Sequence, residues 1–256
     1  FCIICRGCQS SKLTTTRIYN GGYTEDLHIA VKTINARYPK ARIGILGYSL
    51  GGNTVAKYLG EQNSQNEPII KYKQVFDHDP VPEAVIAAAS VGCPFDLYLL
   101  NQIMSHKEQV IVGKGLITYM KKNSQQLSNI PEYNELIKIP ENEIEVRKID
   151  ELITSRVFGY KSLDEFYMDA SSSKFLDGVR IPLIFISTRN DTVSKFVAMP
   201  IQMIENGSNQ NISAILLPGG SHLGAFSFCD TTQTYDEQFL FKYFDYYFDQ
   251  NANKTN

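Results

Sequence analysis

The sequence predicts an α/β protein whose mainly parallel sheet is covered by helices on both faces. Two observations carry this prediction. Short apolar runs, such as IPLIFIST and NISAILLPG, lie between turn residues, which is typical of strands buried on both faces. These runs alternate along the chain with stretches of helical periodicity, and strands that alternate with helices form parallel sheets.

The first elements follow in order from the N-terminal part of the chain. Residues 24–38, TEDLHIAVKTINARY, predict a helix capped by Thr24, because apolar side chains recur on one face at helical spacing. Residues 41–46, ARIGIL, predict a strand that is buried on both faces. The glycine-rich turn GYSLGG comes next, followed by a helix over residues 53–60 that ends at Gly60.

The remaining elements divide the chain into a core and an insert. Residues 61–82 are polar and predict a surface excursion, and residues 83–97 predict another buried strand followed by a loop. From residue 98 to about 180 the pattern is helical, irregular and more charged. Two strands and the closing helix TYDEQFLFKYFDYYFD follow. We therefore expect a core in two parts, 1–97 and 181–256, interrupted by a helical insert over 98–180 that lies above the carboxyl edge of the sheet.

The composition argues against nucleic acid as a partner and against a membrane span. The chain has 256 residues and a formal net charge of -2, with no basic stripe that would neutralise phosphates. No apolar run reaches about 18 residues, so we expect no segment to cross a bilayer. An odd number of cysteines indicates reduced thiols, and no fourth ligand stands near the first three to complete a metal site. The cysteines are Cys2, Cys5, Cys8, Cys93 and Cys229.

One serine lies inside the glycine-rich turn. Gly47-x-Ser49-x-Gly51, between a predicted strand and a predicted helix, is the pattern of a nucleophilic serine on a sharp turn with small neighbours on either side. Leu50, at the start of the helix, offers its backbone N–H to an oxyanion. A phosphate-binding loop would need a lysine followed by Ser or Thr after the glycines, and a dinucleotide fingerprint would need Gly-x-Gly-x-x-Gly after the first strand. Neither pattern is present.

A serine hydroxyl becomes a nucleophile beside a base that a carboxylate orients. Asp191 directly follows the predicted strand IPLIFIST, and His222 follows the next strand within a glycine-rich loop. Serine, acid and histidine thus occur in the order, and at the strand ends, that this chemistry requires on a parallel α/β sheet. Asp96 also follows a strand and is the second candidate for the acid.

Other motifs have simpler interpretations. Asp77-His78-Asp79 holds one histidine in a proline-containing segment, so we expect a solvated acidic loop there rather than a metal site. His28 and His106 are expected at the surface. The closing helix repeats large side chains at helical spacing, which predicts core packing. These side chains are Phe239, Leu240, Tyr243, Phe244 and Tyr247.

As a set, the motifs resemble the YheT/ABHD1-2-3 branch of the α/β-hydrolase superfamily, the EMB8-like esterases and lipases. The resemblance covers Arg6 to about Phe248, and it rests on CRGCQSSKLTTTRIYNGGYTEDL, GYSLGGNTVAKYLGE, GCPFDL, ITSRVFGYKSLDEFYMDASSSKFLDGVRIPLIFIS and GGSHLGAF in this order. It implies an α/β-hydrolase fold with Ser49 as nucleophile, Asp191 as acid and His222 as base.

The chain departs from the pattern of the branch in two loops. Asn190-Asp191-Thr192 stands where the branch usually has Asp-Asp-Pro, with Asp191 in the second, catalytic place of the aspartate pair, and Ser221 stands between the glycine pair and His222. The first residues, FCIICRGC, predict a buried strand. The resemblance implies a second oxyanion donor from a loop upstream of that strand. We therefore expect the chain to be a fragment of a longer protein, and the alternative is a degenerate relative that lacks this loop.

The resemblance further implies a carboxylic ester hydrolase that acts on acylglycerols or phospholipids, with no metal and no organic cofactor. The insert would form a lid and much of the acyl pocket. The expected location is intracellular, at a membrane surface where an apolar anchor precedes the chain. Acyl transfer to an alcohol, an amidase or peptidase activity, and a non-catalytic protein of the same fold are the alternatives, and no motif specifies the oligomeric state.

Overall fold

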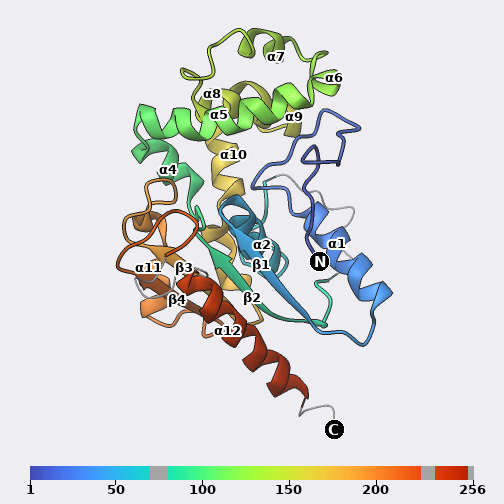
Figure 1. The fold of residues 1–256 in the computed structure, drawn as a ribbon, viewed down its shortest axis with the longest axis vertical. Coiled ribbons are helices and arrows are strands. Elements are labelled where there is room, and N and C mark those ends of the chain that lie inside the picture. Colours follow the sequence, from blue (N-terminus) through green and yellow to red (C-terminus); the bar gives the residue numbers. More distant parts are fainter. Residues whose placement is uncertain (70–79, 226–233, 253–256) are drawn as a thin grey trace.

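The computed structural model describes residues 1–69, 80–225 and 234–252 of the chain. Helices and strands alternate in it (Figure 1). In chain order the elements are α1 (Glu25–Arg37), β1 (Ile43–Tyr48), α2 (Leu50–Gly60), β2 (Val85–Val91), α4 (Leu97–Ile103), α5 (His106–Lys122), α6 (Ser124–Leu127), α7 (Pro131–Leu136), α8 (Val146–Ile149), η1 (Asp150–Thr154), α9 (Ser155–Phe158), α10 (Leu163–Ala170), η2 (Ser172–Gly178), β3 (Leu183–Thr188), η3 (Phe196–Ala198), α11 (Ile201–Glu205), β4 (Ile212–Leu217) and α12 (Tyr235–Ala252).

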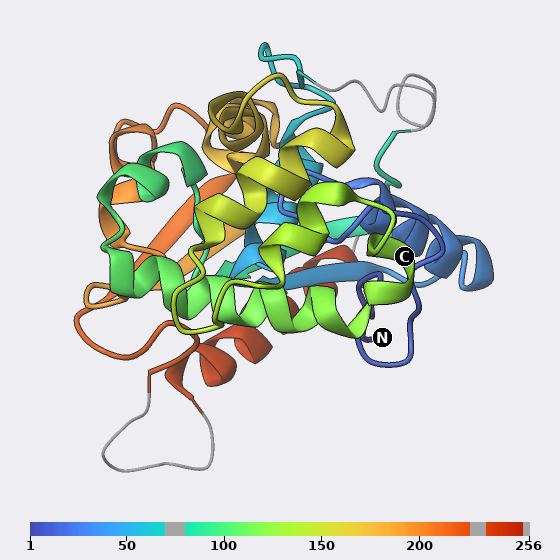
Figure 2. The same cartoon turned by 90° about the horizontal axis from the view of Figure 1, so that it is seen from above.

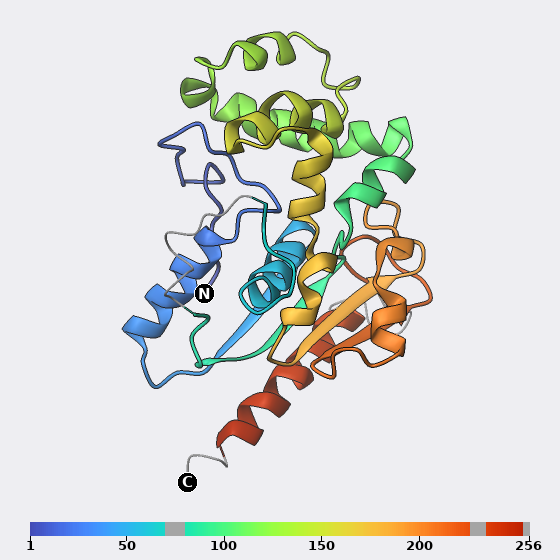
Figure 3. The same cartoon turned by 180° about the vertical axis from the view of Figure 1, so that it is seen from behind.

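The four strands form one parallel sheet in the order β1-β2-β3-β4. α1, α2, η2 and α11 cover one face through an apolar cluster that includes Val55, Leu59 and Phe185. α12 covers the other face, where Leu240 packs in a cluster with Ile186. Figures 1 and 3 show these two layers from opposite sides. The predicted parallel sheet between helical layers is therefore confirmed.

β1 differs from its expectation. It was predicted to be buried on both faces, but Leu46 and Tyr48 are 42% and 36% exposed. The physical reason is that β1 is the edge strand of the described sheet, because residues 1–5, expected to form a buried strand, have no regular secondary structure and do not pair with it. Among the described residues β1 pairs with β2 alone. Leu46 and Tyr48 therefore line an open apolar groove of about 790 Å³ beside the N-terminal segment.

The segment from α4 to η2, all of which is described, contains helices and no strand, as the sequence predicts. The helices from α5 to α9, at the top of Figure 1, lie beyond the carboxyl ends of the strands (Figures 1 and 2). They form an apolar cluster of their own, which Leu13 and Ile18 of the N-terminal segment join. Because the insert shares this cluster with the N-terminal segment, its definition as a separate unit over 98–180 stays a prediction.

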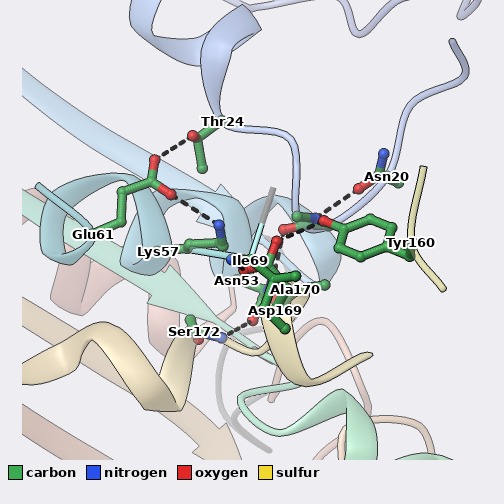
Figure 4. Close-up of polar contacts among 12 residues, drawn as sticks. Asn20, Thr24, Asn53, Lys57, Glu61, Ile69, Tyr160, Asp169, Ala170 and Ser172 are labelled. Atoms are coloured by element: carbon green, nitrogen blue, oxygen red, sulfur yellow. Dashed lines mark hydrogen bonds and ion pairs between the residues drawn. The ribbon is translucent and has the colours of Figure 1, made fainter. Parts of the chain in front are cut away.

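Thr24 and His28, at the start of α1, make contacts that differ from the expectation. Thr24 occupies the N-cap position, but its hydroxyl donates to Glu61 at the end of α2 instead of capping α1 (Figure 4). His28, expected at the surface, is 1% exposed, and its Nδ1 lies 3.1 Å from the Tyr58 hydroxyl. The reason in both cases is that α1 packs against α2, so polar groups at the interface bond to each other. Glu61 also accepts from Lys57 Nζ at 2.9 Å.

The turn between β1 and α2 is one residue long and depends on glycine. An ideal Cβ at Gly47 would lie 2.3 Å from the carbonyl oxygen of Gly51, so no side chain fits there. At Gly52 a Cβ would lie 2.4 Å from Ser90 Oγ. A Cβ at Gly51 meets no described atom within 4 Å. The steric requirement therefore falls on Gly47 and Gly52, and the expectation that Gly51 has to be small is wrong for this structure.

Asn53, in the first turn of α2, joins three segments of the chain. Its side chain is fully buried, and its Nδ2 donates to the carbonyl oxygens of Gly21 at 3.0 Å and Ala170 at 2.7 Å. Its Oδ1 accepts from the N–H of Ser172 at 3.0 Å (Figure 4). These bonds hold the start of α2 against the N-terminal segment and against the end of the insert.

The two glycines of the serine turn give a matched test of its packing. We expect Gly47→Ala to lower the free energy of unfolding by about 3 kcal/mol or to prevent folding, because the added methyl overlaps a backbone carbonyl. Gly51→Ala should change it by less than about 1 kcal/mol, since the site is open and alanine favours a helix. Urea denaturation of both variants measures the difference. Equal destabilisation by the two substitutions would contradict this account of the turn.

A second matched pair tests the three bonds of Asn53. We expect Asn53→Ala to lower the free energy of unfolding by about 3 kcal/mol, because it leaves buried backbone groups without partners. Asn134→Ala is the control, since Asn134 also donates to two backbone carbonyls but is exposed to solvent. Its effect should stay below about 1 kcal/mol, because water replaces the lost bonds. Chemical denaturation of both proteins distinguishes buried from solvated bonds.

Candidate active site

Ser49 is the single residue between β1 and α2. Its backbone has φ 52° and ψ -125°, a conformation that residues other than glycine rarely adopt. The N–H of Ser49 donates to the carbonyl of Val91 at the end of β2, at 2.8 Å. The Ser49 hydroxyl lies 2.7 Å from Nε2 of His222. The strained turn thus brings the hydroxyl to an imidazole from a distant part of the chain.

His222 lies in the loop after β4. Its Nδ1 lies 2.8 Å from Oδ2 of Asp191. Because an ionised carboxylate only accepts hydrogen bonds, Nδ1 donates to it, and Nε2 of the neutral ring accepts from the Ser49 hydroxyl. The ring is therefore held in the tautomer that a general base needs to take a proton from the serine.

Asp191 lies in the loop after β3, and its side chain is fully buried. Its Oδ1 accepts from the backbone N–H groups of Val193 at 2.7 Å and Ser194 at 2.9 Å. Burial raises the pKa of this carboxyl, but the hydrogen bond from His222, the positive charge of that ring when it is protonated, and the two backbone bonds outweigh burial, so the pKa lies below its ordinary value. The group is thus an ionised acceptor whose second oxygen is free to orient the imidazole.

Close backbone packing supports the loop that carries His222. Gly92, at the end of β2, has φ 61°, and an ideal Cβ there would lie 2.4 Å from the carbonyl oxygen of His222. Thr188 Oγ1 donates to the carbonyl of Ser221 at 3.0 Å. Ser221 donates to the carbonyl of Gly224 through its N–H at 2.8 Å and its hydroxyl at 3.0 Å. Sequence reasoning missed Gly92, although a glycine after a buried strand is a signal of close backbone approach.

Asp96, the second candidate for the acid, serves another purpose. It is the N-cap of α4, and its Oδ1 accepts from the N–H of Leu99 at 2.9 Å. The two ring nitrogens of His222 bond to Ser49 and Asp191, and no hydrogen bond in the described part of the chain joins His222 to Asp96. The structure therefore gives the Asp96 carboxylate the role of a helix cap.

A cavity of about 390 Å³ lies beside Ser49 and Leu50. α4 and α5 supply much of its wall. Its apolar lining includes Leu97, Leu100, Met104, Val112, Leu116 and Phe166. The larger groove along β1 does not include Ser49. Leu50 begins α2 at this cavity, and the role of its backbone N–H as oxyanion donor stays a prediction.

The remaining titratable motifs are His106, the cysteines and Asp77-His78-Asp79. Within the described ranges, no three His, Cys, Asp or Glu side chains gather as a metal ion would require. His106 is exposed beside Glu145. Asp77-His78-Asp79 and Cys229 lie outside the described residues. The described thiols are free, namely Cys2, Cys5, Cys8 and Cys93.

Within the described ranges, no helix has the length and apolar character needed to cross a bilayer.

Several curated proteins are similar to the chain. It is 30% identical over 228 residues to a monoacylglycerol lipase of Saccharomyces cerevisiae, an alignment that covers 86% of this chain and 46% of the yeast protein. It is 29% identical over 227 residues to the embryogenesis-associated protein EMB8 of Picea glauca, covering 86% and 45% of the two chains. The identity to mouse phospholipase ABHD3 is 25% over 224 residues, covering 86% and 49%.

The chain spans about half the length of these relatives. No family model matches its sequence. The parallel sheet between helical layers, the order of its strands and the similarity to these relatives agree with the resemblance drawn from the motifs. The chain belongs to the α/β-hydrolase superfamily, in the branch that includes the ABHD2, ABHD3 and EMB8 proteins.

Proposed function

We propose that this chain carries the reacting groups of a serine hydrolase that cleaves carboxylic esters. The observation that supports it best is the chain of hydrogen bonds from Ser49 through His222 to Asp191, with its serine end at an apolar cavity. A hydroxyl, a neutral imidazole and a buried ionised carboxylate in this order are the parts that nucleophilic acyl transfer requires.

The reaction follows from these contacts. His222 Nε2 takes the proton of Ser49 as its oxygen attacks the ester carbonyl, and Asp191 stabilises the imidazolium that forms. The oxyanion of the tetrahedral intermediate accepts from the backbone N–H of Leu50, and the family resemblance assigns a second donor to an upstream loop. His222 then returns the proton to the departing alcohol, and the same base activates a water that releases the acid from Ser49.

The substrate class follows from the cavity and from the relatives. An apolar cavity of about 390 Å³ next to the nucleophile suits an acyl chain. Among the similar proteins, the yeast one is called a monoacylglycerol lipase and the mouse one a phospholipase. We propose acyl esters of glycerol lipids as the substrates. No metal and no organic cofactor has a part in this mechanism.

Ser49 is the nucleophile in this proposal, so it should be the residue that a fluorophosphonate probe labels. We expect Ser49→Ala to abolish both labelling and ester hydrolysis, because Ser49 carries the one hydroxyl among the described residues that bonds to His222. Gel detection of the labelled protein, and a panel of matched esters and amides, provide the measurements. Labelling that persists in the variant would mean that another residue is the nucleophile, and a wild-type protein that neither labels nor hydrolyses would favour a non-catalytic protein. Faster cleavage of the amides would favour an amidase.

Two aspartates provide a matched test of the acid. We expect Asp191→Asn to lower kcat by about 10⁴-fold, because an amide no longer holds the required tautomer of His222. Asp96→Asn should leave kcat within about twofold, since asparagine caps a helix as well as aspartate does. Steady-state kinetics on one ester compares the two variants. The opposite ranking would identify Asp96 as the acid.

A further inference from the structure

Asp150 is an unusual group in the wall of the cavity that contains Ser49. It begins the π-helical segment η1, and π-helical turns within helices occur frequently at functional sites. The residue is 8% exposed, and burial raises the pKa of its carboxyl to about 6 against the lowering effect of two hydrogen bonds. A buried carboxyl in an apolar wall is costly unless a partner compensates it. No cation forms an ion pair with Asp150 within the described residues.

The carboxyl has unused capacity to accept hydrogen bonds. Its Oδ1 accepts from Thr154 Oγ1 at 2.6 Å, and its Oδ2 accepts from the Tyr167 hydroxyl at 2.9 Å. Each carboxylate oxygen accepts two bonds, so both keep a free lone pair. The Tyr167 oxygen, whose proton points to Asp150, is also available as an acceptor, and Tyr167 lines the same cavity. Asp150 and Tyr167 thus offer a compact set of acceptors.

Other polar residues of the cavity do not satisfy this pair. Gln109 is already engaged, because its Oε1 accepts from the N–H of Arg147 and its Nε2 lies 3.3 Å from Asn101 Oδ1. Asn20 and Ser194 also line the cavity, and their buried Nδ2 and Oγ atoms have no partner within the described part of the chain. The cavity therefore contains polar atoms whose bonding is incomplete.

A second buried pair in the insert shows what a purely structural arrangement looks like. Asp169 is 2% exposed, its Oδ2 accepts from the Tyr160 hydroxyl at 2.6 Å, and its Oδ1 accepts from the N–H of Ile69 at 2.7 Å (Figure 4). This pair ties the insert to the segment before residue 70 and does not line the cavity. It is a matched control for Asp150 and Tyr167.

We propose that Asp150 and Tyr167 form a subsite that binds a hydroxyl of the alcohol part of the substrate, as in an ester of glycerol or another polyol. The inference rests on the proposed function and deepens it. A ligand hydroxyl donates to a free lone pair of Asp150, and a neighbouring hydroxyl donates to the oxygen of Tyr167. An ester of a simple alkanol makes neither bond, so the subsite selects polyol esters over alkyl esters of the same acid.

The test compares 1-octanoylglycerol with propyl octanoate, which has the same skeleton without the two hydroxyls. We expect Asp150→Asn and Tyr167→Phe to lower kcat/KM for octanoylglycerol about 10- to 100-fold, mainly through KM, because each loses a bond to a polar ligand. For propyl octanoate kcat/KM should stay within about twofold. Asp169→Asn should change kcat/KM for the two esters by the same factor. Tyr167→Phe keeps the aromatic ring, so the proposal stays testable if Asp150→Asn fails to fold.

Any of the following three results would contradict the proposed subsite. An equal loss for both esters in the Asp150 and Tyr167 variants would mean a structural role. A selective loss for octanoylcholine, with octanoylglycerol unchanged, would mean a site for a cation. A wild-type protein that hydrolyses propyl octanoate and octanoylglycerol equally well would rule out the preference for polyol esters, while the proposed ester hydrolase activity would still hold. Failure of the proposed function is distinct, since the wild type would then hydrolyse neither ester and Ser49 would not label.

Discussion

The close approach of the β1 and α2 backbones at Gly47 is the constraint on which the rest of the site depends. Because no side chain separates Gly47 from the carbonyl of Gly51, the chain passes from strand to helix through one residue. That residue, Ser49, adopts a backbone conformation that costs about 1–3 kcal/mol. The bond from its N–H to Val91 and the three bonds of Asn53 hold the turn on two sides. The serine is therefore presented by packing that belongs to the whole sheet.

Local patterns predicted the order of strands and helices from α1 onward, because each apolar run or helical stripe carries its own signal. The strand expected at the start of the chain is not formed, and Phe1 is 88% exposed. Local patterns failed where burial depends on a partner far along the chain. His28 is buried because α1 lies against Tyr58, and nothing near His28 in the sequence specifies that contact. Leu46 and Tyr48 are exposed because β1 lies at the edge of the described sheet, and the run ARIGIL does not specify that position. Thr24 likewise bonds to Glu61 of another helix.

The residues of the candidate site that belong to sequence motifs could be predicted, and the others could not. Ser49, Asp191 and His222 each follow a strand, and the structure brings their side chains within hydrogen-bonding distance, while their catalytic roles stay predictions. Asp150 could not be found in this way, because it lies in an irregular helical stretch without a motif. Its π-helical turn and its place in the cavity wall depend on how the insert folds over the sheet. Functional residues of the insert therefore cannot be predicted from motifs.

Gly92 shows that such a site also depends on a position without any reactive atom. A methyl group there would press on the carbonyl of His222 and displace the imidazole, although all three polar side chains would be unaltered. A comparison of natural variants that scores only reactive groups would therefore pass over a damaging change at this strand end. A designer who transfers the three side chains to another parallel sheet has to transfer the bare backbone beside them as well.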